Sequence, residues 1–375
     1  MTIASQNNNI THLDEFPENS AAAALACACR PPRRSFLSKL AALGAAGALP
    51  GGLMAQEPKR APVVAHGKPY RIDVHHHLMY PGYLEEVGGR RAGSTFKWSP
   101  ALSIEDMDRS GIAVSLLSLI QPSASIGDVE KARRVARLSN EFGAQLARDH
   151  PGRFGSFATI PLLDTEGSLK EIEYALDTLK AHGIGLMTSY QDRYLGDAAF
   201  APVWEELNRR KTVIYTHPLS PECCRNIKSD VPPAVVEYAT DTTRTIASLV
   251  FSGTAARYPD VRWIFSHSGG TMPFLLSRFT RQEVDMKERA KERMPKGLMH
   301  ELKKFHYDTA QGNHSGALAA LMKIVTPSQV LFGTDFPFRD GAEEIEGLTA
   351  FRFQPKDLRA IERDNALKLL PTLKA

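Results

Sequence analysis

Three consecutive histidines follow an aspartate at the end of the first strand-like run, in the segment Asp73-Val74-His75-His76-His77. Because side chains alternate between the two faces of a strand, His75 and His77 point the same way and His76 points the other way. The two imidazoles on the shared face are about 7 Å apart along the strand. If the end of the strand curls, both rings can bind one metal ion, and His76 is then structural.

Two further histidines and one carboxylate stand at the ends of later strand-like runs. His217 ends the fifth run, His267 ends the sixth, and Asp335 follows the eighth. A single histidine at a strand end usually packs or hydrogen bonds, but several such ends at one edge are difficult to explain by packing. Three imidazoles and a carboxylate suit Zn²⁺, and also Fe²⁺ or Mn²⁺. An open position on such an ion holds a water whose pKa falls toward about 7.

Eight strand-like runs, alternating with helical segments, must position these residues. The strands are predicted at Tyr70–His75, Ile112–Leu119, Arg153–Ile160, Gly183–Thr188, Thr212–His217, Val261–His267, Lys304–Thr309 and Gln329–Thr334. The helices are predicted at Ile104–Ser110, Ile126–His150, Gly167–Ala181, Ala198–Arg210, Ala234–Tyr258, Thr271–Arg293, Ser315–Lys323 and Pro355–Leu370.

This alternation predicts an α/β fold, a single-domain TIM-type (β/α)8 barrel, in which catalytic groups lie at the carboxyl ends of the strands. A doubly wound open sheet is the alternative. No Gly-x-Gly-x-x-Gly follows the first strand, which argues against a dinucleotide-binding fold. Two long loops, 79–101 and 219–233, follow strands that end in histidine and would cover the same end of the barrel.

The N-terminal region has the pattern of an export signal. The run Arg33-Arg34-Ser35-Phe36-Leu37 precedes a weakly apolar stretch rich in Ala and Gly at 41–49, as in twin-arginine signals. We therefore predict a signal peptide at 1–55, a linker at 56–69 and the barrel at 70–375. Such a signal predicts export by the twin-arginine machinery to the periplasm. The alternative is a disordered Ala-rich N-terminus on a cytoplasmic protein.

The composition excludes several classes of function. The net charge of +4 over 375 residues is small and evenly spread, so it does not favour nucleic-acid binding. No run of 18 apolar residues follows the leader, and we expect no membrane span there. Cys223 and Cys224 are adjacent, which disfavours a disulfide between them. They are predicted to be free thiols, with a substrate-lining or soft-metal role as the alternative.

Together these motifs resemble the amidohydrolase superfamily, and within it the metal-dependent decarboxylases, over about residues 70–370. That branch includes decarboxylases of aminocarboxymuconate semialdehyde, 6-methylsalicylate and γ-resorcylate. The resemblance implies four metal ligands, which fall on His75, His77, His217 and Asp335. It places the catalytic histidine on His267. Because carboxylate ligands can shift between metal and substrate, we also expect Asp335 to share the proton transfer. Ser268 stands where the family usually has glycine.

Two absences narrow the subclass. Two-metal members of the superfamily bridge their ions with a lysine or glutamate at the end of strand four, but residues 185–189 contain neither. Deaminase-type members carry a glutamate shortly after the strand-five histidine, but residues 218–220 are not acidic. One divalent ion is therefore expected, with Zn²⁺ favoured over Mn²⁺ and Fe²⁺.

Four arginines are candidates for binding a substrate carboxylate. Arg278 lies eleven positions after the catalytic histidine, where an arginine of the family's decarboxylases reaches the substrate of the neighbouring subunit. This reading implies a homodimer, and a helix-surface arginine is the alternative. Arg244 and Asp241 are expected to form an i,i+3 pair, although both are also candidates for the site. Arg90 and Arg91 lie in the first long loop, where the family also places a carboxylate-binding arginine.

The chemistry that follows is nonoxidative decarboxylation of an aromatic or unsaturated carboxylic acid, such as the hydroxybenzoate 6-methylsalicylate. Breaking the C–CO₂⁻ bond leaves two electrons on carbon, which a metal ion stabilises electrostatically, and His267 transfers the replacing proton. The alternative is a mononuclear metal hydrolase of a lactone, ester or amide, with His267 as general base. A non-catalytic exported metal-binding protein is the third hypothesis.

Overall fold

The computed structural model describes residues 68–88, 97–224, 226–228 and 230–373, all of which belong to one compact unit, Ala61–Ala375. The predicted signal peptide, nearly all of the predicted linker, and Arg90 and Arg91 lie outside the described residues. Among the described helices, none has the length and apolar character needed to cross a membrane.

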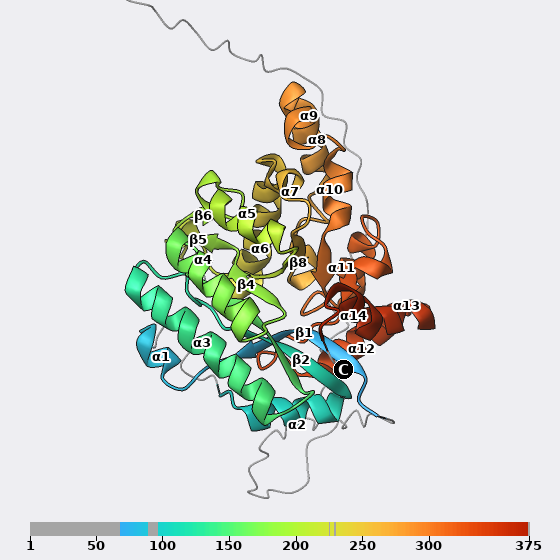
Figure 1. Cartoon of the computed structure of the whole chain (residues 1–375). Coiled ribbons are helices and arrows are strands. Elements are labelled where there is room, and N and C mark those ends of the chain that lie inside the picture. Colours follow the sequence, from blue (N-terminus) through green and yellow to red (C-terminus); the bar gives the residue numbers. More distant parts are fainter. Residues whose placement is uncertain (1–67, 89–96, 225, 229, 374–375) are drawn as a thin grey trace, which may run out of the picture. The chain divides into compact units, whose positions relative to one another are not determined.

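The eight predicted strands all form, and they make one parallel sheet. In spatial order they are β1 (Arg71–Leu78), β2 (Ile112–Leu119), β3 (Phe154–Thr159), β4 (Gly183–Met187), β7 (Val213–His217), β8 (Arg262–Phe265), β9 (His306–Asp308) and β10 (Val330–Leu331). The outermost strands meet, because the Val74 N–H donates to the Phe332 carbonyl at 3.0 Å and His76 pairs with Phe336. The sheet is thereby closed into the predicted barrel, and the helices surround the strands (Figure 1).

The helices between the strands are α1 (Tyr83–Glu86), α2 (Pro100–Ser110), α3 (Val129–Asp149), α4 (Thr165–Glu173), α5 (Ala201–Arg209), α6 (Pro233–Phe251), α7 (Thr254–Arg257), α8 (Leu276–Met286), α9 (Glu288–Arg293), α10 (Leu298–Lys304) and α11 (Ser315–Leu321). The last strand is followed by α12 (Gly341–Phe351), α13 (Pro355–Arg359) and α14 (Asn365–Leu369). A small antiparallel hairpin pairs β5 (Ser189–Tyr190) with β6 (Arg193–Tyr194).

Two helices that we predicted as continuous are broken. The segment predicted at Ala234–Tyr258 divides at Gly253, whose φ of 84° leaves the right-handed helical region. The segment predicted at Thr271–Arg293 begins later, at Leu276, and divides at Lys287, whose φ is 53°. Periodicity did not reveal these breaks, because they depend on the backbone angles of single residues.

Local sequence signals explain where other elements begin and end. Ser99 caps α2 by accepting a hydrogen bond from the Leu102 N–H, and Gly111 ends it with a φ of 63°. Asp128 caps α3 in the same way through the Lys131 N–H. These caps set the helix starts, and therefore the lengths of the loops that lead from the carboxyl ends of the strands.

A small apolar cluster fills the interior of the barrel toward the amino ends of the strands. The carboxyl ends are left for polar groups. The cluster joins strand side chains such as Ile72, Val114 and Ile264 to Leu369 of α14. Its upper boundary is Tyr215, whose ring lies 5.3 Å from the His75 ring between centroids. The larger cluster lies between the strands and the surrounding helices, as expected for a parallel sheet buried on both faces.

Candidate metal centre

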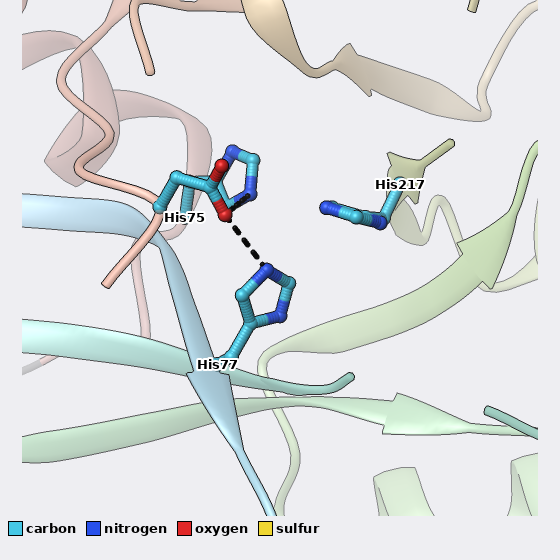
Figure 2. A group of neighbouring side chains, drawn as sticks. His75, His77 and His217 are labelled. Carbon is cyan, nitrogen blue, oxygen red and sulfur yellow. Dashed lines mark hydrogen bonds and ion pairs between the residues drawn. The ribbon is translucent and has the colours of Figure 1, made fainter. Parts of the chain in front are cut away.

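The structure brings the four predicted ligands together. The ligand atoms of His75, His77, His217 and Asp335 all lie within 4.8 Å of one another, and all four residues are buried. Ring centroids are 5.2 Å apart for His75 and His77, 5.2 Å for His75 and His217, and 4.6 Å for His77 and His217. Figure 2 shows these rings, from β1 and from the end of β7, turned toward a common point.

A carboxylate from β9 orients the His75 ring. The His75 Nδ1 lies 2.9 Å from Asp308 Oδ2, and both side chains are fully buried. This leaves the His75 Nε2 toward the centre, 3.2 Å from Asp335 Oδ1. A histidine that binds a metal commonly has its other nitrogen held by a carboxylate in this way. We did not single out Asp308 in the sequence, although it lies one residue before the end of the seventh predicted strand.

His76 is turned away from the centre, as the strand alternation predicted. Its ring stacks on Phe336 with centroids 4.7 Å apart, and its Nε2 lies 3.0 Å from Ser103 Oγ. Its Nδ1 lies 2.9 Å from Asp73 Oδ2. Asp73 also accepts hydrogen bonds from the backbone N–H and the hydroxyl of Thr334. Asp73 therefore joins β1 to the segment that carries Asp335, rather than orienting a ligand ring.

The two carboxylate oxygens of Asp335 contact different side chains. Its Oδ1 lies 2.9 Å from His77 Nε2, and its Oδ2 accepts a hydrogen bond from the Gln311 Nε2. Asp335, His267 and Gln311 have φ values of 66°, 55° and 50°, in the left-handed region that non-glycine residues seldom adopt. Such strained positions cluster at functional sites, where the surrounding structure holds them. The sequence offered no signal for Gln311.

The charges of the centre favour a bound cation. Burial lowers the pKa of His75, but the carboxylates of Asp308 and Asp335 outweigh this effect and raise it to about 10. Burial would raise the pKa of Asp335, yet His75 and His77 hold it well below its usual range. Burial and the neighbouring imidazoles hold the pKa of His217 well below its usual range, so this ring is neutral. A divalent ion would displace the proton that His75 attracts.

The hydrogen-bonding state of the rings also fits a metal. Within the described structure, His75 Nε2, His77 Nδ1 and His217 Nδ1 are buried without a hydrogen-bond partner. Buried polar atoms are nearly always satisfied, so an unpartnered nitrogen on each of three neighbouring imidazole rings needs an explanation. Three imidazoles and a carboxylate are the donor set of a mononuclear Zn²⁺, Mn²⁺ or Fe²⁺ site.

His267 stands beside the centre without belonging to the set of four. The predicted sixth strand ends at Phe265, and His267 begins the turn that follows it. Its ring stacks on His75 at 5.0 Å, and its Nε2 lies 3.9 Å from Asp335 Oδ2. Burial and the His75 ring lower the pKa of His267. A neutral imidazole at this position can accept a proton and return it.

Ser268 fits the turn despite replacing the family's usual glycine. Its φ is 56°, and its hydroxyl donates to the Gly312 carbonyl at 3.2 Å. This hydrogen bond joins the turn of His267 to the loop after β9. A serine at this position therefore still holds the turn that carries His267.

A cavity of about 480 Å³ opens over the centre. His217, His267 and Asp335 form its polar floor, and Val235 and Phe338 are among its apolar walls. It adjoins a second, more polar cavity of about 420 Å³. The Gln121 amide and the Tyr238 hydroxyl line both cavities and are hydrogen bonded at 3.2 Å.

The predicted substrate arginines are not at the centre in the described chain. Arg244 on α6 and Arg278 on α8 are exposed, and neither lines the two cavities. The expected ion pair between Asp241 and Arg244 is wrong, because no such pair within 4 Å forms in the described structure. Asp241 is buried in the middle of α6, where it accepts hydrogen bonds from the hydroxyls of Thr188 and Tyr194.

The two adjacent cysteines are free thiols, as predicted. Their sulfur atoms are 3.6 Å apart at the surface.

Comparisons with known proteins identify the family. The sequence profile of the amidohydrolase family matches residues 72–372. The decarboxylase macB of Penicillium terrestre is 36% identical over 323 residues, which cover 80% of this chain and 95% of that protein. The 6-methylsalicylic acid decarboxylase of Penicillium expansum is 35% identical over 316 residues, which cover 81% and 97%. The chain therefore belongs to the amidohydrolase family.

The fold is also found in a solved decarboxylase structure. A dihydroxybenzoic acid decarboxylase from Polaromonas sp. JS666, with bound manganese and the inhibitor 2-nitroresorcinol, superposes with a TM-score of 0.70. The match covers 82% of this chain and 98% of that one at 22% identity. This likeness establishes the barrel fold that the strand pattern predicted.

Proposed function

We propose that this protein is a metal-dependent nonoxidative decarboxylase of an aromatic carboxylic acid, with a hydroxybenzoate such as 6-methylsalicylate as substrate. The observation that supports this most is the buried group of three histidines and one aspartate, with His267 beside it on the floor of a cavity. The decarboxylases that are 35–36% identical over most of their length support the same reaction.

His75, His77, His217 and Asp335 would hold the ion. A divalent ion bound there supplies a Lewis acid that polarises an oxygen of the substrate. The acidic Asp308 behind His75 makes that ring a better donor, and Gln311 fixes the outer oxygen of Asp335.

Side chains of this protein would deliver the proton that replaces CO₂. The C–CO₂⁻ bond breaks, its electron pair stays on the ring carbon, and one proton takes the place of CO₂. His267 is placed to transfer this proton because its neutral ring faces the cavity. Asp335, 3.9 Å away, is placed to share it. The apolar walls formed by Val235 and Phe338 would hold the aromatic ring and exclude water.

For the resident ion we propose Zn²⁺, because three imidazoles and a carboxylate are ligands that it commonly takes. The manganese in a decarboxylase of the same fold supports Mn²⁺ as the alternative. Elemental analysis of protein purified without added metal separates the two.

We further propose that two copies associate so that Arg278 of one reaches the cavity of the other, because Arg278 is exposed and lies outside the cavity of its own chain. The solution mass would then be twice 41.3 kDa for the full chain. The arginine pair at 33–34 supports export to the periplasm by the twin-arginine machinery. Replacing both with lysine should retain the protein in the cytoplasm.

The reaction is tested by incubating metal-loaded protein with 6-methylsalicylate and measuring CO₂ release. We expect stoichiometric CO₂ and 3-methylphenol, with loss of turnover after chelation and recovery on adding the ion. A panel of lactones, esters and amides tests the hydrolase alternative on the same site. Hydrolysis of these compounds without CO₂ release from any hydroxybenzoate would favour the hydrolase.

A further inference from the structure

A substrate carboxylate needs a cationic partner, and the described cavities offer one side chain of that kind. Among the described residues that line the cavity over the metal centre and the polar cavity beside it, Arg339 is the single lysine or arginine. Because Arg244 and Arg278 lie outside both cavities, neither reaches a substrate bound in its own chain.

The backbone fixes Arg339 close to the centre. The Phe338 N–H donates to the Asp335 carbonyl at 2.9 Å, and the Arg339 N–H donates to the same carbonyl at 3.3 Å. Arg339 thus stands one turn beyond a predicted metal ligand. Its side chain lines the same cavity as His267.

The guanidinium of Arg339 is weakly held where it stands. Its Nε lies 3.5 Å from Glu343 Oε1 on α12, and its Nη1 donates to the Phe338 carbonyl at 3.1 Å. In the described part of the chain its Nη2 has no hydrogen-bond acceptor. The side chains of Arg339 and Glu343 are 48% and 42% exposed, so water screens their attraction and the pair contributes little stability.

We propose that Arg339 binds the carboxylate of a substrate in the cavity of its own chain. Its guanidinium would exchange its contact with Glu343 for the substrate. This proposal rests on the proposed function. A guanidinium suits this task because its N–H groups can bind both oxygens of a carboxylate at once. The two candidate arginines for the substrate carboxylate can be told apart. Arg339 belongs to the chain that holds the metal ligands, whereas Arg278 would come from a second copy.

This role predicts a particular kinetic signature. As the C–CO₂⁻ bond breaks, negative charge leaves the carboxyl group and CO₂ departs neutral. An arginine on the carboxylate therefore stabilises the bound substrate at least as well as the transition state. Removing it should raise KM and leave kcat unchanged or slightly higher, unlike the loss of a group that moves protons.

The test compares the binding of two ligands to metal-loaded protein by calorimetry. Salicylate carries the carboxylate, and phenol lacks it. R339Q should weaken salicylate binding about tenfold and change phenol binding less than about twofold, as expected for one charge-assisted hydrogen-bonded pair. R339K should lie between R339Q and the parent. E343Q should strengthen salicylate binding, because it removes the competing carboxylate.

The matched control is R209Q. Arg209 is an exposed arginine on α5 that pairs with Glu206 at 2.7 Å and lines neither cavity. R209Q should leave both affinities unchanged, and R278Q tests the arginine of a second copy. Metal content is measured for every variant. This separates a loss of affinity caused by loss of the ion from one caused by the substitution of the arginine.

Three outcomes would overturn the proposal. The first is an unchanged affinity for salicylate in R339Q, the second an equal loss for salicylate and phenol, and the third a loss confined to R278Q. If the parent protein released no CO₂ from any hydroxybenzoate, the proposed function would fail, yet the salicylate and phenol affinities would still decide whether Arg339 binds a carboxylate.

Discussion

At the scale of single residues, two of the candidate ligands are held in place by a neighbouring side chain. The Asp308 carboxylate fixes the ring of His75, and Gln311 fixes the outer oxygen of Asp335. The grouping of the four candidate ligands was predictable because histidines and an aspartate lie at the ends of several strands. Their supporting residues were not, since a lone Asp308 or Gln311 has no distinguishing spacing and acts only once the strands are side by side.

Asp308→Asn is predicted to weaken metal binding about 10- to 100-fold. Asparagine keeps an acceptor for the His267 and Ala310 backbone N–H groups, but it removes the negative charge beside His75. A competition titration with a chelator measures the affinity. Asp177→Asn, which changes an exposed carboxylate paired with Arg210, is the control and should bind metal like the parent.

Equal affinities of the Asp308→Asn variant and the parent would refute the role assigned to this carboxylate. Circular dichroism on both proteins must show the same folded barrel for the comparison to hold.

At the scale of elements, the strands were predictable and several helices were not. Buried parallel strands are continuous apolar runs, and all eight appear in the structure close to their predicted bounds. The short helices α1, α10 and α12 were missed, because four to eleven residues of mixed character show no clear period. The breaks at Gly253 and Lys287 depend on local backbone angles that periodicity does not report.

β9 carries a partly buried histidine, His306, that should make stability depend on pH. Burial lowers the pKa of His306 to about 4, against about 6.5 in an unfolded chain. The unfolded state therefore binds the proton more readily below pH 6.5. The stability contribution is complete above pH 6.5 and is lost as the pH falls toward 4, by roughly 2 kcal/mol at pH 5.

Urea unfolding of the parent and of His306→Gln between pH 7.5 and pH 5 checks this effect. Glutamine does not titrate, so the difference in unfolding free energy between the two proteins should shrink as the pH falls. A constant difference across this range would show that His306 does not titrate as described.

At the scale of the whole molecule, the metal centre connects distant parts of the chain. The four candidate ligands come from β1, from the end of β7 and from the segment after β10, which approach one another only in the folded barrel. An ion that binds this folded arrangement and not the unfolded chain stabilises it by mass action. The centre should therefore contribute to the stability of the barrel as well as to its chemistry.

Removing the ion is predicted to lower Tm, and restoring it should raise Tm with increasing free metal concentration. An excess of 100 times Kd corresponds to about 2.7 kcal/mol. Differential scanning calorimetry of chelated and reloaded protein measures this. His217→Ala serves as the control, because it removes one ligand and should largely abolish the response to metal; a full response in that variant would contradict the ligand assignment.

The central claim is that this centre, with His267 beside it, replaces a carboxyl group on an aromatic ring with a proton. Its most direct test is NMR of metal-loaded protein with carboxyl-¹³C 6-methylsalicylate in D₂O. We predict that the label leaves as CO₂ and bicarbonate, that deuterium appears on the carbon that carried the carboxyl group, and that His267→Ala retains its metal but loses turnover. Full turnover by His267→Ala, or a carboxyl label that stays on the ring while His267 and the metal are intact, would contradict the account.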